Sequence, residues 1–108
     1  MRRGDIVTVA APGDDGKPRP AVVMQGDVLN RDARSTLEAS MTSHLREPPL
    51  LRLTVEPIGD NGPRVLSQAQ VNRLLSLPSK QVGSPIGRLS DRENVELNRL
   101  LAVVIGLA

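Results

Sequence analysis

The chain has 108 residues, which is the length of one domain, and we expect a single domain over residues 1–108 with no separate cofactor-binding half. It contains no cysteine and one histidine, His44, which excludes a disulfide framework, a thiol nucleophile and a His–Cys metal centre within one chain, so neither a metal nor a cofactor is expected. Fourteen Lys and Arg against twelve Asp and Glu give a formal charge of +2, a weak indication of an anionic partner.

The first half of the chain predicts short strands joined by loops. The β-rich run 5–10 ends before a Pro-Gly pair, and residues 21–24 form a second strand, so the two predict a hairpin with a long tip. Residues 28–35 are polar and are expected to be a loop. Residues 36–41 are expected to be a third strand, although residues 37–39 would also tolerate a helix.

The second half predicts further strands. Residues 50–55 alternate in character and predict a strand, and Gly59–Pro63 predicts a turn. Residues 65–66 and 71–77 are less regular, and the second stretch fits either a strand or a helical turn. Residues 86–89 predict a last short strand.

The C-terminal segment predicts a helix. Ser90 and Glu93 have the spacing of a capping box, and apolar residues then continue to an end near Gly106. Toward its end this helix is apolar on more than one face, so we expect it to pack on the sheet or on a second subunit. Short strands with one terminal helix favour a small barrel that closes its own sheet edges.

The composition predicts a cytoplasmic protein that does not enter a membrane. No apolar run approaches the roughly 20 residues needed to cross a bilayer, and no apolar stretch of signal-peptide length follows the basic residues of Met1–Asp5. Phe, Trp and Tyr are absent, so the core must be aliphatic. The usual stacking platform for single-stranded nucleic acid is missing as well.

Four segments carry a family resemblance across essentially the whole chain. They are Arg3–Val7, Gly16–Val23, Thr42–Ser43, and Ile86–Leu89 leading into a helix that ends at Ile105–Gly106. In this order they resemble the MazF/PemK-type toxins of type II toxin–antitoxin systems, and R-P-A-V-V at 19–23 is the most specific part. The resemblance implies a mainly β fold with a C-terminal α-helix, the SH3-like small β-barrel of MazF, PemK and CcdB.

The same resemblance implies a function. Members of the family are homodimers that cleave single-stranded RNA, including mRNA, at specific sequences and without a metal. The RNA 2′-hydroxyl attacks its own adjacent phosphate and leaves a 2′,3′-cyclic phosphate and a 5′-hydroxyl. Their protein partner is an antitoxin whose acidic, flexible segment occupies the RNA groove.

Three residues are the catalytic candidates. Arg19 matches the motif arginine of the family, and a guanidinium can hold two oxygens of a phosphorane-like centre or protonate the leaving 5′-oxygen. Thr42 supplies a strand-end hydroxyl that can orient a phosphate oxygen. His44 is an imidazole beside it, suited to proton transfer near neutral pH. Without the flanking motif, Arg19 would be interpreted as an ordinary surface arginine.

The expected RNA-binding residues are more numerous and comprise Gly16, Lys17, Arg19, Thr42, Ser43, Ser67 and Gln68. Ser67–Gln68 falls where some members of the family carry Asp-Gln, with the aspartate proposed as general base. Because Ser67 cannot accept a proton as a carboxylate does, the base is left open between His44 and another group. Ser43 is explained almost as well by a hydrogen-bonded turn. The loop Pro12–Pro18 could be a flap that covers the RNA, and it is equally consistent with a hairpin tip that has no role in function.

Three rival interpretations stay open at this point. A CcdB-like gyrase-directed toxin relies on C-terminal aromatic residues, which residues 100–108 lack. A barrel that binds RNA or an acidic peptide without cutting fits the missing aspartate and the missing aromatics. An inactivated or idealised variant is the third, because a natural barrel without Phe, Tyr and Trp is unusual.

Overall fold

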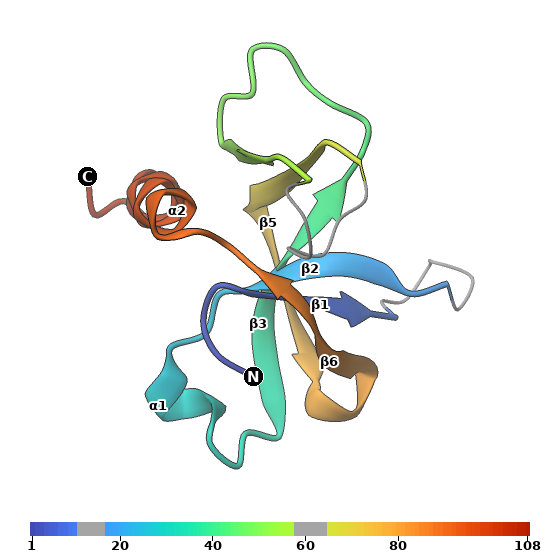
Figure 1. Ribbon diagram of the computed structural model, residues 1–108. Coiled ribbons are helices and arrows are strands. Elements are labelled where there is room, and N and C mark those ends of the chain that lie inside the picture. Colours follow the sequence, from blue (N-terminus) through green and yellow to red (C-terminus); the bar gives the residue numbers. More distant parts are fainter. Residues whose placement is uncertain (11–16, 58–64) are drawn as a thin grey trace.

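A six-stranded antiparallel sheet with a long C-terminal helix forms the protein (Figure 1). This computed structural model describes residues 1–10, 17–57 and 65–108. The strands are β1 (Asp5–Val9), β2 (Arg19–Val23), β3 (Ser35–Thr42), β4 (Arg52–Val55), β5 (Ser67–Pro78) and β6 (Val82–Arg88), in the spatial order β4-β5-β3-β2-β1-β6. The predicted fold class, mainly β with a C-terminal helix, is confirmed.

The strand pairing confirms one expectation and corrects another. β1 and β2 pair antiparallel as the predicted hairpin, with Val9 opposite Arg19. In contrast, β4 and β6 are the two edges of the sheet, and no pairing among the described residues joins them. The predicted barrel closure is therefore not found, and the described strands form a sheet with two edges. A register shift between Ala39 and Met41 interrupts the β3–β5 ladder. A shift of this kind is typical of a β-bulge, which bends the strand that carries it.

Two segments differ from their predictions, and a third resolves an open alternative in favour of a strand. The expected loop after residue 27 begins with a short helix, α1 (Asp27–Asn30), whose Leu29 and Asn30 amides donate to the Gly26 carbonyl. The irregular stretch 71–77 belongs to β5, because pairing with β3 continues to Pro78. β6 begins at Val82, earlier than predicted, after the short 3-10 helix η1 (Ser79–Gln81), and its pairing partner is β1.

Helix α2 (Asp91–Val104) begins and ends as predicted. The Ser90 hydroxyl accepts a hydrogen bond from the Glu93 amide at 3.1 Å, and the Glu93 carboxylate accepts one from the Ser90 amide at 2.8 Å. At the other end Gly106 takes a φ of +80°, and the amides of Gly106 and Leu107 donate to carbonyls of the last turn in a Schellman motif. None of the helices in the described part of the chain is long and apolar enough to span a membrane.

Aliphatic side chains build two clusters on opposite faces of the sheet. The larger lies between the sheet and α2 and consists of Ile6, Val22, Met24, Ala39, Met41, Leu53, Val55, Ala69, Val71, Leu89, Leu97 and Leu100. The smaller lies on the other face and consists of Val7, Val9, Ala21, Val23 and Leu77. Successive strand residues point to opposite faces, which is why Ile6 and Val7 enter different clusters.

The Arg-Gly-Asp segment near the N-terminus forms a turn that connects the sheet to helix α2. The Asp5 amide donates to the Arg2 carbonyl, and the Asp5 carboxylate accepts from the Arg2 amide at 2.8 Å, which closes a turn before β1. Gly4 within this turn has a φ of +90° and lies directly against the side chain of Asn94 on α2. The turn therefore joins the start of the sheet to the start of the helix.

Candidate active site

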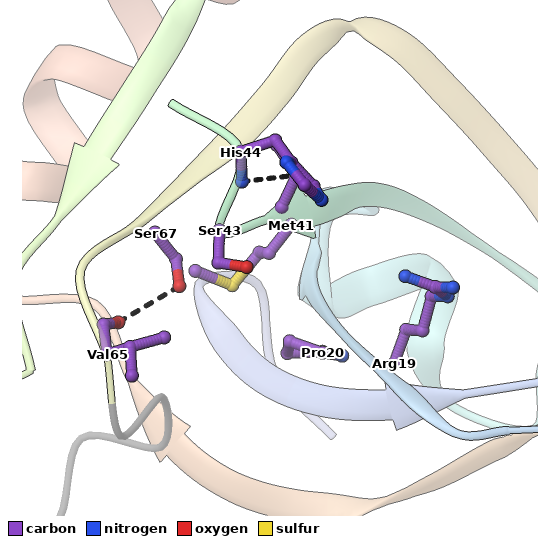
Figure 2. Close-up of a pocket in the computed structure, with 8 residues that line it drawn as sticks. Arg19, Pro20, Met41, Ser43, His44, Val65 and Ser67 are labelled. Carbon is purple, nitrogen blue, oxygen red and sulfur yellow. Dashed lines mark hydrogen bonds between the residues drawn. The ribbon is translucent and has the colours of Figure 1, made fainter. Parts of the chain in front are cut away.

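A cavity of about 240 Å³ lies where three strands begin or end. β2 begins at Arg19, β3 ends at Thr42 and β5 begins at Ser67, so chain segments far apart in sequence meet at one place. The lining residues are Arg19, Pro20, Met41, Thr42, Ser43, His44, Val65 and Ser67. Figure 2 shows Arg19 on one side of the cavity, Ser67 on the other, and His44 between them.

Arg19 is placed by the β1–β2 hairpin. It is the first residue of β2, its backbone pairs with Val9, and its side chain is exposed at the rim of the cavity. Pro20, the next residue, contributes an apolar surface. The structure thus places the first catalytic candidate at the cavity that also holds the other two.

Thr42, Ser43 and His44 form the turn that follows β3. The hydroxyl oxygen of Thr42 accepts a hydrogen bond from the His44 amide at 3.1 Å (Figure 2). Because this oxygen acts as an acceptor, its own proton can be donated to a phosphate oxygen in the cavity. The side chains of Ser43 and His44 are both exposed, and both line the cavity.

Ser67 has a different character. Its side chain is buried, 3% exposed, and its hydroxyl donates to the Val65 carbonyl at 3.0 Å. Ser67 therefore presents an oxygen to the cavity while its proton is already used. The described lining residues include no carboxylate, so among them the imidazole of His44 is the group able to take a proton.

The remaining predicted residues lie away from the cavity or beyond the described chain. The side chain of Gln68 is 2% exposed and is hydrogen-bonded to the backbone of Arg46. It is not one of the described lining residues of the cavity. Lys17 is exposed shortly before β2 and is not one of the described lining residues. Gly16 and most of the predicted flap Pro12–Pro18 lie outside the described residues, as does the turn predicted at 59–63.

Sequence reasoning did not identify the apolar part of the cavity. Pro20, Met41 and Val65 line it together with the guanidinium, hydroxyl and imidazole groups. Pro20 and Met41 are adjacent in sequence to the predicted site residues Arg19 and Thr42, whereas no sequence pattern indicated a site role for Val65. Such a combination can hold an anion on its polar groups and a ring face on its apolar ones. The described part of the chain holds no group of three His, Cys, Asp or Glu side chains that could bind a metal ion.

Comparison with known proteins gives the family. The profile of a family described as "PemK-like, MazF-like toxin of type II toxin-antitoxin system" matches residues 2–105. A relative in Mycolicibacterium smegmatis, named a probable endoribonuclease MazF, is 36% identical over 109 aligned positions, which cover 100% of this chain and 99% of the relative. The chain belongs to the PemK-like, MazF-like family of type II toxins.

Solved structures agree with the fold. The Mycobacterium tuberculosis toxin MazF-mt6 superposes with a TM-score of 0.82 at 18% identity, covering 96% of this chain and 98% of that one. A mycobacterial endoribonuclease in complex with its cognate antitoxin gives 0.81 at 17% identity, with 100% and 97% covered. A MazE–MazF structure from Deinococcus radiodurans gives 0.78 at 18% identity, again with 100% and 97% covered.

Proposed function

We propose that the protein is a sequence-specific endoribonuclease that cleaves single-stranded RNA, including mRNA, without a metal and acts as the toxin of its toxin–antitoxin pair. The observation that carries the proposal is the meeting of Arg19, Thr42 and His44 at one cavity. Membership of the MazF-like family supports it, and the M. smegmatis relative is named a probable endoribonuclease.

The proposed reaction is an internal transfer on the RNA. The 2′-oxygen forms a bond to the adjacent phosphorus, and the bond from phosphorus to the 5′-oxygen breaks, giving a 2′,3′-cyclic phosphate and a 5′-hydroxyl. His44 accepts the proton of the 2′-hydroxyl, in the role that Ser67 cannot fill. Arg19 neutralises the charge that builds on the phosphate oxygens and supplies the proton to the leaving oxygen, while the Thr42 hydroxyl donates to a phosphate oxygen.

The partners follow from the same site. We propose an antitoxin whose acidic, flexible segment occupies the cavity, because a carboxylate and a phosphate make similar contacts with the Arg19 guanidinium. Two of the matching structures hold such pairs, an endoribonuclease with its cognate antitoxin and a MazE–MazF pair. The proposal also places the protein in the cytoplasm, where mRNA is found, and treats it as a homodimer.

The test is cleavage of a long RNA in EDTA, with mapping of the cut sites and of the end groups. We expect discrete cuts with cyclic-phosphate ends. In Arg19→Ala the cleavage rate should fall by at least about 100-fold. Arg31→Ala is the matched control, because Arg31 is exposed before the start of β3 and the cavity lies at the other end of that strand. Intact RNA after incubation with folded, antitoxin-free protein would refute the proposal.

A non-catalytic barrel is the second candidate. The observation that favours it is the absence of a carboxylate among the described lining residues, with Ser67 in place of the family's aspartate. Such a protein would retard RNA in a mobility assay without cutting it. A CcdB-like protein would instead block supercoiling by gyrase and leave RNA intact.

A further inference from the structure

The amide of Gln68 is fully occupied inside the protein. Strand register places Gln68 of β5 between Thr42 of β3 and Thr54 of β4. Its side-chain oxygen accepts from the Arg46 amide at 2.9 Å, and its side-chain nitrogen donates to the Arg46 carbonyl at 3.1 Å. This pair of hydrogen bonds reproduces the pairing of two strand residues, with a side chain in place of one backbone.

Arg52 on β4 fastens the same segment at a second point. One nitrogen of its guanidinium donates to the His44 carbonyl at 3.0 Å, and the same nitrogen lies 3.4 Å from the Gln68 side-chain oxygen. The backbone of His44 is thereby held on both sides, since its amide already donates to the Thr42 hydroxyl. Gln68, Arg52 and Thr42 are together called the loop clamp below.

Hydrogen bonds rather than burial hold this loop. Every side chain from Ser43 to Pro48 is exposed, so side-chain burial contributes little to holding the segment. A segment with few buried contacts opens easily unless polar bonds restrain it. The segment nevertheless carries Ser43 and His44, which line the cavity opposite Arg19 (Figure 2).

We infer that Gln68 and Arg52 are positioning residues, which fix Ser43 and His44 relative to Arg19, and that Gln68 is not itself an RNA ligand. The inference rests on the proposed nuclease function. It accounts for the glutamine of the Ser67–Gln68 pair: Ser67 lines the cavity, whereas the Gln68 side chain is buried and its amide secures the loop through Arg46.

The test variant is Gln68→Met, which keeps the length and unbranched shape of the side chain and removes its hydrogen bonds. Because a small misplacement of a reacting group costs up to about 100-fold, we expect single-turnover cleavage to slow by about 10- to 100-fold. Affinity for a 2′-O-methyl RNA of the same sequence, which cannot react, should change by less than about 3-fold. Gln70→Met is the matched control, since Gln70 lies on the same face of β5 opposite Arg52.

Two results of these cleavage and binding measurements would overturn the inference. One is a Gln68→Met variant that cuts at the wild-type rate. The other is a loss of affinity for the unreactive RNA as large as the loss of rate, which would make Gln68 an RNA ligand. The double variant Gln68→Met, Arg52→Met should lose less than the product of the two single losses, because both side chains restrain one loop.

Hydrogen exchange separates this inference from the proposed function. In wild-type protein the Arg46 amide should be protected, and in Gln68→Met its exchange should speed by at least about 10-fold, with sheet amides such as that of Val22 unchanged. Unaltered protection at Arg46 would overturn the clamp even if RNA is cut. Failure of the wild type to cut RNA would refute the nuclease proposal, and this measurement would still report on the clamp.

Discussion

Glu38 occupies an unusual place for a carboxylate. It lies on β3 with a side chain that is 0% exposed, opposite Val23 of β2 and Leu75 of β5. One carboxylate oxygen accepts a hydrogen bond from the Thr36 hydroxyl, and the other, Oε2, is buried without a partner in the described structure. Burial away from water raises the pKa of Glu38 above its ordinary value of 4.5, and the bond from Thr36 opposes that rise only in part.

The stability of the protein should therefore depend on pH through Glu38. Above pH 4.5 the unfolded chain has released the Glu38 proton, whereas the folded protein retains it until pH reaches the raised pKa. The folded state binds more protons in that window, so the free energy of unfolding should fall as pH rises. In Glu38→Gln this fall should be absent, as measured by urea denaturation at several pH values above 4.5.

Glu96→Gln is the control for this prediction. Glu96 is exposed on α2, and its hydrogen bond with Arg99 lowers its pKa, so its contribution is present above the ordinary value and lost in acid. The fall above pH 4.5 should persist in this variant. An equal slope in wild type and Glu38→Gln would show that Glu38 is not the group responsible.

At the scale of elements, the joint between the N-terminal turn and α2 decides how the helix meets the sheet. Gly4 has a φ of +90°, and a Cβ at that position would lie 2.5 Å from the side-chain oxygen of Asn94. The Leu89 amide donates to the Gly4 carbonyl just before the helix begins. Both the backbone conformation and the close approach require glycine here.

Gly4→Ala should lower the free energy of unfolding by about 2–4 kcal/mol, from backbone strain and overpacking against Asn94 together. Chemical denaturation would measure the loss. Gly106→Ala separates the two causes, because Gly106 has a φ of +80° with nothing within 4 Å of an added Cβ. Gly26→Ala, which meets neither obstacle, should stay within about 0.5 kcal/mol of wild type. A Gly4→Ala protein as stable as Gly26→Ala would contradict this account of the joint.

At the scale of the whole molecule, apolar side chains remain outside the two clusters. On α2 and the tail that follows it, Val95, Val103, Ile105 and Leu107 are exposed by 69, 47, 54 and 77%. β6 is an edge strand with Ile86 exposed as well. A chain of this size buries only about two-thirds of its unfolded surface, so association that covers such residues stabilises it.

The proposed homodimer can be tested in solution. Sedimentation equilibrium at micromolar concentrations should give twice the chain mass of 11.6 kDa. If the helix forms the interface, Val103→Asp should weaken association by about 10-fold or more, since a buried unpaired carboxylate is strongly unfavourable there. Val28→Asp, at an exposed apolar position on α1, is the control and should leave the mass unchanged. A single-chain mass for the wild type would refute the dimer.

Local patterns determined much of the fold. The Ser90–Glu93 capping box and Gly106 marked both ends of α2, because caps depend on residues adjacent in sequence. The β1–β2 hairpin followed in the same way from two β-rich runs around a turn. The family resemblance likewise depended on the sequence alone, and it supplied Arg19, Thr42, Ser43 and Ser67. The chemistry of an imidazole beside Thr42 added His44, and the structure brings all five residues to one cavity.

Long-range contacts decided what the sequence could not show. β5 and β6 extend beyond their predicted bounds because their partners β3 and β1 supply the hydrogen bonds, which local propensity does not report. For the same reason nothing in the sequence distinguished an open sheet from a closed barrel. Gln68 matched an RNA-binding position, yet its amide pairs with Arg46, 22 residues away. Such a contact exists only after β3, β4 and β5 have assembled, so tertiary structure alone defines the loop clamp.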